Sequence, residues 1–225
     1  KGTANAVMTA LPYVRNFNRP IIVLYADTPF VTKEIINSLH QKINSGNDMC
    51  VLGFSADNPY GYGRLVQSSE GTLMSIVEES EASETEKQIK NVNAGIMAFS
   101  GGSIKAILKK ITPSNSKKEY FLTDVVYIGY KDNLNIDFIL TEQKYVYGIN
   151  DREQLAMAEL LAQNYLRKNA MLAGVTMIAP ETVFLQKDTK LGKDVTIEPN
   201  VIFGKSVSLA KNCYIKSFCY LEECS

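Results

Sequence analysis

The sequence predicts an α/β protein with a mixed, mainly parallel sheet, followed by a parallel β-helix. Three observations lead to this fold class. Apolar runs typical of buried strands alternate with stretches of helical periodicity over most of the chain. One of these runs, beginning at Ile21, leads directly to a single acidic residue. From Leu185 onward, hydrophobic residues recur every six positions instead.

Composition limits the possible classes of function. The chain has 225 residues, of which 45% are hydrophobic, with 24 basic and 24 acidic side chains, so it can bury one large domain and a small one. The balanced charge offers no electrostatic footprint for nucleic acid. No apolar run reaches the roughly 18 residues that a membrane span needs, and there is no signal-peptide pattern. We therefore expect a cytoplasmic protein.

The cysteines do not form a recognisable ligand or redox motif. No two of them have C-x-x-C spacing, which argues against a zinc ribbon or a redox pair. We expect buried free thiols at Cys50, Cys213, Cys219 and Cys224.

The run from Ile21 to Leu24 predicts a strand that is buried on both faces, and Pro29 ends it. Asp27 would then lie at the carboxyl end of a central parallel strand, where open α/β sheets bind ligands. The alternative is that Asp27 only caps the next helix. Thr32 is better placed as that cap, for an amphipathic helix over residues 33–43. A free carboxylate at a strand end suits a magnesium ion shared with substrate phosphates.

The elements around this strand follow a regular order. A short Ala-rich helix, which begins at Gly2 and Thr3 and ends near Leu11, could offer backbone N–H groups to a base or a phosphate, or could be an ordinary helix start. Residues 49–54 predict a second buried strand, and the β–α–β order implies a parallel pair with a right-handed crossover.

A glycine-rich segment precedes the next strands. Gly61 and Gly63 bracket a tyrosine, which permits either a close backbone approach to a ligand or a plain turn. Strands are expected at residues 65–66 and 73–77, the second ending at Glu78. The polar run 79–90 reads as a solvated loop or helix without a chemical role.

Residues 92–99 predict another strand, with Asn93 inside an apolar stretch. A buried amide needs partners, which could be backbone groups or sugar hydroxyls. Helices are expected over residues 102–111 and after Thr123, and strands over 138–141 and 145–149, the last ending at Asn150. Asp151 and Gln154 form a capping box for a long helix that runs to about Asn169.

The hexad pattern then predicts the C-terminal fold. One aliphatic or aromatic residue recurs every six positions, and a smaller residue follows four places later. Three such hexads make one turn of a triangular coil, so residues 18 apart, such as Val195 and Cys213, should stack. The two sets are Leu185, Leu191, Ile197, Phe203, Leu209, Ile215 and Leu221, and Thr189, Val195, Val201, Val207, Cys213 and Cys219.

Seven short motifs precede the hexads in a fixed order. They are Gly2-Thr3-Ala4-x-Ala6, Leu24-Tyr25-Ala26-Asp27-x-Pro29, Gly61-Tyr62-Gly63-Arg64, Ile76-Val77-Glu78, Asn93-x-Gly95, Glu119-Tyr120-x-x-Thr123-Asp124 and Gly148-x-Asn150. With these motifs, the chain resembles the bacterial GlmU family, which is both N-acetylglucosamine-1-phosphate uridyltransferase and glucosamine-1-phosphate acetyltransferase. The resemblance implies a Rossmann-like nucleotidyltransferase domain at 1–150, a linker helix and connection at 151–184, and the first coils of a left-handed, hexapeptide acyltransferase-type β-helix at 185–225.

The resemblance also implies a reaction. An oxygen of N-acetylglucosamine 1-phosphate attacks the α-phosphorus of UTP, which releases pyrophosphate and gives UDP-N-acetylglucosamine for peptidoglycan and lipopolysaccharide precursors. Positioning and charge neutralisation carry such chemistry, and the implied cofactor is Mg²⁺. By resemblance, the magnesium ligands would be Asp27 and Asn150, the uridine contacts Gly2 and Thr3, the nucleotide-sugar contacts Tyr25 and Ala26, and the N-acetylglucosamine contacts Gly63, Glu78, Asn93 and Thr123.

Several positions depart from the family pattern. Ala26 stands where the family usually has glycine, and Asn5 replaces a usual histidine. We expect both ends to be cut, with the glycine-rich triphosphate loop before Lys1 and the acetyltransferase residues after Ser225. This fragment should therefore be inactive and should assemble weakly. The full-length protein would be a homotrimer that also uses acetyl-CoA and glucosamine 1-phosphate.

Two other readings remain open at this point. The first is another sugar-1-phosphate nucleotidyltransferase with a hexapeptide tail, such as one that joins glucose 1-phosphate to ATP or dTTP. The second is a non-catalytic relative that keeps the fold as a binding or assembly module. Glu78 and Asn93 favour an N-acetylated amino sugar through the resemblance, and the sequence upstream of Lys1 would test for a glycine-rich loop.

Overall fold

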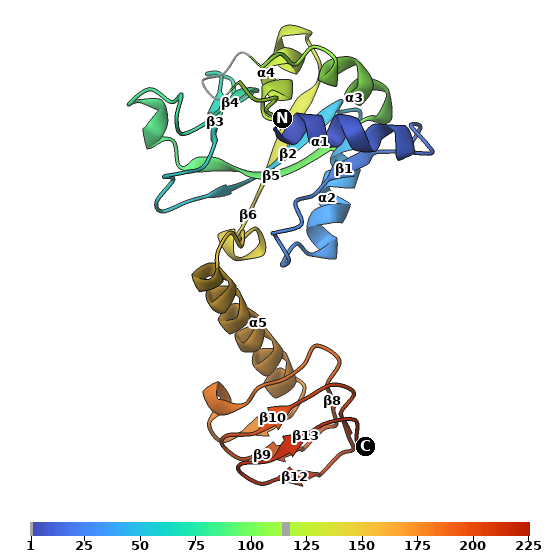
Figure 1. The fold of residues 1–225 in the computed structure, drawn as a ribbon, viewed down its shortest axis with the longest axis vertical. Coiled ribbons are helices and arrows are strands. Elements are labelled where there is room, and N and C mark those ends of the chain that lie inside the picture. The colour runs from blue at the N-terminus through green and yellow to red at the C-terminus, as the bar shows by residue number, and fades with distance from the viewer. Residues whose placement is uncertain (1, 114–117) are drawn as a thin grey trace. The chain divides into compact units, whose positions relative to one another are not determined.

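The computed structural model describes residues 2–113 and 118–225 (Figure 1). The chain forms two compact units, Lys1–Gly148 and Ile149–Ser225. This boundary lies two residues before the one expected from sequence, and it joins the residues expected as a linker, 151–184, to the hexads.

The first unit is built around a six-stranded sheet of order β4-β3-β5-β2-β6, with β1 also paired to β5. Relative to β5, the strands β1, β2 and β3 are antiparallel, and β6 is parallel to β2. Four of the six strands therefore point the same way, although only one neighbouring pair is parallel. The strands are β1 (Ile21–Val23), β2 (Met49–Ser55), β3 (Arg64–Gln67), β4 (Leu73–Val77), β5 (Asn91–Phe99) and β6 (Ile136–Thr141).

The predicted parallel pair between the first two strands is wrong. Strand β5 lies between them, because Met97 to Phe99 pair with β1 on one side and with β2 on the other. The placement of Asp27 at the end of a central parallel strand is also wrong. Strand β1 ends at Val23 and Asp27 lies in the turn beyond it. An apolar run signals burial, but it does not identify the neighbouring strand.

Strand β1 is also less buried than its composition suggests. Its three residues are half-buried, and Leu24 is 49% exposed. Within the described ranges, β1 is paired on one side only, to β5.

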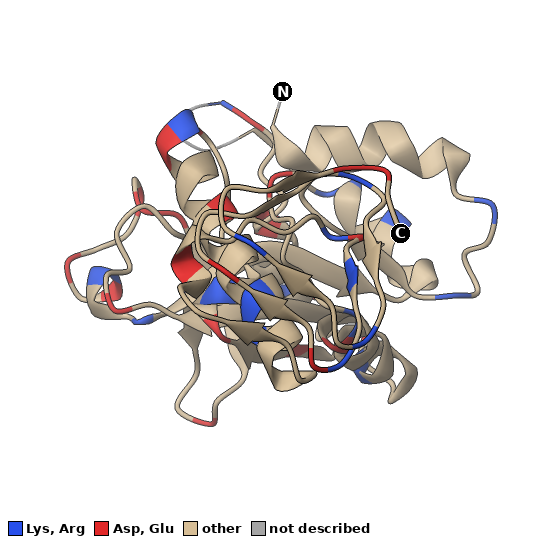
Figure 2. Ribbon diagram, turned by 90° about the horizontal axis from the view of Figure 1, so that it is seen from below, with Lys and Arg blue, Asp and Glu red and all other residues tan. Residues whose placement is uncertain are grey.

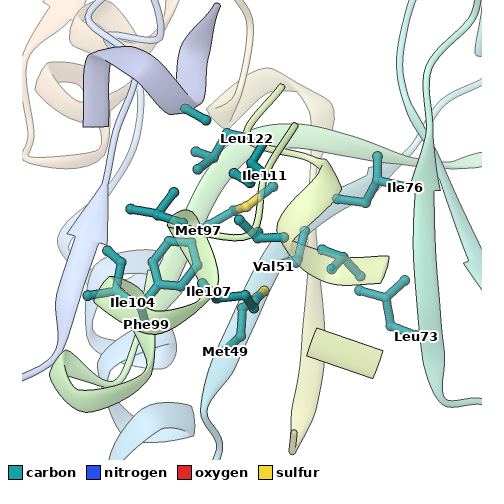
Figure 3. Close-up of a cluster of buried hydrophobic side chains, with 14 of the residues drawn as sticks. Met49, Val51, Leu73, Ile76, Met97, Phe99, Ile104, Ile107, Ile111 and Leu122 are labelled. Carbon is teal, nitrogen blue, oxygen red and sulfur yellow. The ribbon is translucent and has the colours of Figure 1, made fainter. Parts of the chain in front are cut away.

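Alternate residues of β2 and β5 supply two separate cores. One core contains Met49, Val51, Met97 and Phe99, and Figure 3 shows these side chains together with Ile104 and Ile107 of a helix that covers the sheet. Cys50, Leu52, Ile96 and Ala98 face the other core. This alternation is the two-residue period of a strand, and it makes the unit a three-layer sandwich.

Helices cover both faces of the sheet. Residues of α1, α3 and α4 pack in the first core, and residues of α2 pack in the second. Thr32 caps α2 as predicted, since its hydroxyl accepts from Ile35 N at 3.4 Å. The helices are α1 (Thr3–Ala10), α2 (Lys33–Asn44), α3 (Gly101–Leu108) and α4 (Asp124–Lys131), with short 3-10 turns η1 (Leu11–Tyr13), η2 (Glu86–Gln88) and η3 (Gln143–Tyr145).

The expected strand over residues 145–149 is wrong. The segment after β6 contains η3 and then irregular backbone, so Asn150 does not follow a strand. The apolar composition of Tyr145 to Ile149 is explained in part by Val146, which is buried in the second core. One buried side chain, in a segment whose backbone has no pairing partner, leaves irregular backbone instead of a strand.

The second unit begins with the long helix α5 (Arg152–Leu172). Asp151 caps it as predicted, accepting from Gln154 N at 2.7 Å, whereas the Gln154 side chain bonds back to Asn150 N. The helix packs on the hexads through buried polar side chains. Gln163 both donates to Leu185 O and accepts from Leu185 N, each at 2.9 Å, and Arg167 donates to Val183 O at 3.1 Å.

The hexads form short strands on three parallel ladders. The pairs β8–β11, β9–β12 and β10–β13 each join residues 18 positions apart, the spacing expected from the sequence. Asp194, Asn200, Ser206, Asn212 and Phe218, six residues apart, all have positive φ and form corners. The strands are β7 (Thr176–Met177), β8 (Lys190–Leu191), β9 (Thr196–Ile197), β10 (Ile202–Phe203), β11 (Ser208–Leu209), β12 (Tyr214–Ile215) and β13 (Tyr220–Leu221), with η4 at Pro180–Thr182.

Charged residues are distributed over both units. Basic and acidic positions are interspersed along the ribbon in Figure 2. Among the described residues, no helix is both long and apolar enough to cross a membrane.

Candidate active site

Three neighbouring strands bring predicted site residues into one row. Arg64 at the start of β3 pairs with Val77 of β4 and with Val92 of β5. Continuing both registers by one residue places Gly63 opposite Glu78 on one side and opposite Asn93 on the other. The bond from Asn93 N to Gly63 O, at 2.7 Å, fixes this arrangement. Three separate segments of the chain thus meet at one end of these strands.

Strand β5 bulges immediately after Asn93. In the pairing with β2, Asn93 lies opposite Gly53 and Ile96 lies opposite Leu52, so Ala94 and Gly95 are extra residues. Gly95 has φ +77°, and its N–H donates to Asn93 Oδ1 at 2.9 Å. The amide oxygen of Asn93 is therefore used by the backbone, while its NH₂ group remains the part that a ligand could meet.

The bulge makes room for Tyr25. A Cβ built on Gly95 would lie 2.3 Å from Cε2 of Tyr25, so the ring rests directly on the glycine backbone. Burial raises the pKa of the Tyr25 phenol, a hydrogen bond with Thr3 lowers it, and the carboxylates of Glu78 and Asp27 raise it again. Tyr25 therefore lies among these three predicted site residues and stays a neutral phenol near pH 7.

Gly2 and Thr3 are fixed against the segment that precedes α4. Gly2 has φ +80°, and a Cβ there would lie 2.4 Å from the Tyr120 carbonyl oxygen. The Thr3 hydroxyl accepts from Leu122 N at 2.9 Å, and Ala4 N donates to Tyr120 O at 3.0 Å. The start of this helix, considered above as a source of N–H groups for a base or a phosphate, is thus packed closely against the protein's own backbone.

Thr123 links the segment that precedes α4 to Glu78. Its side chain is buried, and its hydroxyl donates to Glu78 Oε1 at 2.9 Å. The other oxygen, Glu78 Oε2, would lie 3.4 Å from a Cβ on Gly63. Seven of the predicted residues are joined in this way within the first unit: Gly2, Thr3, Tyr25, Gly63, Glu78, Asn93 and Thr123.

Asp27 has an unusual environment. Its Oδ1 atom is buried and has no hydrogen-bond partner in the described structure. A buried carboxylate oxygen without a partner is unfavourable unless a cation or a donor reaches it. A hard divalent cation such as Mg²⁺ takes oxygen ligands of this kind, so the donor chemistry fits.

The two remaining predicted residues are exposed. Ala26, which stands where the family usually has glycine, is exposed between Tyr25 and Asp27. Asn150 belongs to the second unit, where its backbone N–H donates to Gln154 Oε1 at 2.6 Å. Its side chain is not among the buried groups that lack partners.

Sequence reasoning missed several residues of this site. Gly95 had a signal, because a glycine inside a strand pattern often marks a bulge. Tyr120 and Leu122 contribute backbone groups, which leave no trace in side-chain chemistry. In the run 79–90, which was expected to have no chemical role, Glu79 makes a structural contact, an ion pair with the buried Arg64.

Asp124 adds a titratable carboxyl beside the site. Desolvation, followed by the charges of Glu81 and Glu78, raises the pKa of Asp124 from 3.8 to about 6. The folded state therefore holds this proton more tightly than the unfolded state, and ionisation removes stability as the pH rises from about 4 to about 6.

We expect Asp124→Asn to stabilise the protein above pH 6 by up to about 1 kcal/mol, allowing for screening of this half-buried group, with no gain at pH 4. Thermal unfolding of both forms between pH 4 and 8 measures this difference. An equal effect at all pH values would show that the charge of Asp124 is not the cause.

Comparisons with known proteins identify the family of the chain. The family model described as nucleotidyl transferase matches residues 1–145. A protein of Brucella anthropi described as bifunctional protein GlmU is 41% identical over 180 residues, which cover 80% of this chain and 39% of that protein. Relatives with the same description from Xanthobacter autotrophicus and Nitrobacter hamburgensis are 45% and 43% identical, each over 80% of this chain and 40% of theirs.

These relatives confirm the resemblance to GlmU that the motifs indicated. The chain spans about two fifths of the length of the curated relatives that it matches. The family match covers the whole sheet and the linked residues described above. The chain belongs to the nucleotidyl transferase family.

Proposed function

We propose that the protein containing this chain transfers uridyl groups from UTP to N-acetylglucosamine 1-phosphate, giving UDP-N-acetylglucosamine and pyrophosphate. One observation supports the proposal beyond the family match: an oxygen of Asp27 is buried without a hydrogen-bond partner. It lies near the group of residues, from Thr3 to Asn93, that are linked by polar contacts. The GlmU relatives support the choice of substrates.

Nucleotidyl transferases of this kind generally use a divalent metal. We assign the role of magnesium ligand to Asp27. For Asn150, the same role is implied by the resemblance to GlmU alone. When bound, the ion would neutralise phosphate charge during the displacement. Such a site needs few protein ligands, because Mg²⁺ keeps waters and substrate phosphates in its other positions.

The chain's own residues bind and orient the substrates. A sugar-phosphate oxygen forms a bond to the α-phosphorus of UTP while the bond to the leaving pyrophosphate breaks, so alignment is the main requirement. In our proposal, the NH₂ group of Asn93 and the backbone of Gly63 hold the N-acetylglucosamine group. Glu78, kept in place by Thr123, accepts from a sugar hydroxyl. Gly2 and Thr3 meet the uridine.

The direct test is a substrate panel with the complete protein. UTP, dTTP and ATP are each combined with N-acetylglucosamine 1-phosphate, glucosamine 1-phosphate and glucose 1-phosphate, and pyrophosphate release is measured. We expect release to be fastest with UTP and N-acetylglucosamine 1-phosphate. Preference for dTTP and glucose 1-phosphate would favour the rival enzyme, and no release with any pair would favour a binding module.

Glu78→Ala and Asn93→Ala should weaken the binding of N-acetylglucosamine 1-phosphate more than the binding of UTP. Each change removes a polar contact to the sugar, which corresponds to about a tenfold rise in the KM of the sugar phosphate. Steady-state kinetics with each substrate varied in turn measures the difference.

Asn93→Asp is a useful companion variant, because it keeps the Oδ1 acceptor for Gly95 N but loses the NH₂ donor. It should raise the KM of the sugar phosphate selectively, as Asn93→Ala does. Equal effects on both substrates would show that these side chains only support the scaffold.

For the second unit, we propose the start of a left-handed parallel β-helix, with acetyl-CoA-dependent acetylation of glucosamine 1-phosphate carried out by the full-length protein. The three ladders with their 18-residue steps support this assignment. We further propose a homotrimer, which would cover an outward-facing apolar row. Phe184, Ile202 and Tyr220 pair along one ladder and are 47%, 45% and 62% exposed.

Ile202→Lys should therefore shift the complete protein from trimer towards monomer, because it places a charge within an apolar contact. Ser208→Lys, an exposed position on another ladder, is the matched control and should leave the trimer intact. Sedimentation velocity measures both. An unchanged trimer from the Ile202 variant would show that another face makes the contact.

A further inference from the structure

The ion pair between the buried Arg64 and the partly exposed Glu79 lies immediately beside the proposed sugar contacts. The Arg64 side chain is 2% exposed, and one of its terminal nitrogens lies 2.5 Å from Glu79 Oε2. The same nitrogen donates to the Tyr62 carbonyl oxygen. A guanidinium placed so deeply requires a partner, since an unpaired buried charge is strongly unfavourable.

Glu79 connects this pair to the glycine turn. Its Oε2 atom accepts from Gly61 N at 3.1 Å. The bond from Gly61, followed by the bond from Arg64, lowers the pKa of the Glu79 carboxyl. Tyr62 N donates to Pro59 O at 3.2 Å, and Gly61 has φ +86°, which are the features of a glycine turn. One ion pair thus holds residues 61 and 62 against residue 79.

The register of the two strands shows what the pair positions. Side chains alternate across a strand, so Gly63 and Glu78 share one face of the β3–β4 pair, where Glu78 Oε2 would lie 3.4 Å from a Cβ on Gly63, and Arg64 points to the other face. Glu79, in the turn that follows β4, meets Arg64 there. The ion pair therefore lies behind the row formed by Gly63 and Glu78. Arg64 directly follows Gly63 in the chain, and Glu79 directly follows Glu78, so a shift of either partner of the ion pair moves the neighbouring backbone.

We propose that Arg64 and Glu79 are positioning residues that set the separation between the Gly63 backbone and the Glu78 carboxylate, and so determine affinity for the sugar phosphate. We call the contacts of Glu79 with Arg64 and Gly61 the clamp. The identity of the sugar rests on the proposed function, whereas the existence of the clamp does not. Neither side chain contacts the ligand. The pair acts because Gly63 and Glu78 each lie one residue from a fixed point.

The test compares Glu79→Ala, Glu79→Gln and a control in the complete protein. Asp137→Ala is the control, because it removes the ion pair between Asp137 and Lys42, 2.7 Å long, which joins β6 to α2. We expect Glu79→Ala to raise the KM of the sugar phosphate about tenfold while the KM of UTP changes less than about twofold. Glu79→Gln keeps an oxygen for Gly61 N and should show a smaller rise. Asp137→Ala should change neither constant.

Hydrogen exchange supplies a second measurement that does not depend on activity. Amide exchange in peptides covering residues 59–66 and 76–82 should speed up in Glu79→Ala and not in Asp137→Ala. Unchanged exchange in folded Glu79→Ala overturns the clamp. Faster exchange with equal changes in both KM values overturns the role in sugar affinity. If Glu79→Ala fails to fold, Glu79→Gln decides by the same criteria. A wild-type protein that is inactive with every sugar phosphate overturns the proposed function alone, because the exchange comparison still tests the clamp.

Discussion

Asp27→Asn in the complete protein should lower uridyl transfer by about a thousandfold or more, which corresponds to roughly 4 kcal/mol of lost transition-state stabilisation. The change keeps the shape of the side chain but removes the charge that would bind the metal. Because Asp27 Oδ1 is buried without a partner, the metal-free variant should be at least as stable as the wild type. Loss of activity would then occur without loss of fold.

Two measurements separate a metal ligand from a structural carboxylate. Added Mg²⁺ should raise the unfolding temperature of the wild type and should not raise that of Asp27→Asn. Asp48→Asn is the contrasting variant, because Asp48 accepts from Ser103 Oγ at 2.6 Å and from Asn135 N at 3.1 Å. It should lose stability and keep its response to magnesium. Wild-type turnover and magnesium dependence in Asp27→Asn would rule out the metal role.

Gly95→Ala should be damaging for two reasons that can be measured separately. The backbone at φ +77° disfavours any residue with a Cβ, at about 1–2 kcal/mol, and the new methyl group would collide with the Tyr25 ring. We expect a total loss of about 2–4 kcal/mol of stability. Because Tyr25 would move away from Asp27 and Thr3, activity should fall by about a hundredfold.

Gly71→Ala isolates the backbone contribution. Gly71 has φ +86°, but a Cβ there would have no atom within 4 Å, so this variant should lose only the backbone part and keep full activity. Combining Gly95→Ala with Tyr25→Ala should remove the collision and make the two stability effects less than additive. Strict additivity would mean that the ring does not rest on Gly95.

The sequence was informative where residue type alone determines the outcome. Thr32 was predicted as a helix cap because its hydroxyl can satisfy a free N–H group, and the structure shows that bond. The hexads from Leu185 onward predicted stacking at intervals of 18 residues, and the ladders have that spacing. In both cases, the interaction is local or is repeated along the chain.

Other expectations failed where the outcome depends on partners distant in sequence. The apolar run at Ile21 was expected to pair in parallel with β2, but β5 lies between them. The run from Tyr145 to Ile149 had strand composition without a pairing partner. A strand's neighbour and direction are set by long-range packing, which the composition of a short segment does not encode.

The candidate site shows the same division. The sequence by itself identified residue types suited to binding a metal and a nucleotide sugar, and their order along the chain indicated the family. Only the tertiary structure decided that Gly63, Glu78 and Asn93 lie in one row, that Gly95 bulges to seat Tyr25, and that an ion pair at Arg64 lies behind them. Gly95 carried a local signal for a bulge, but cross-strand register and the identity of the ring that meets Gly95 arise from packing over long sequence separations, which a local pattern does not specify.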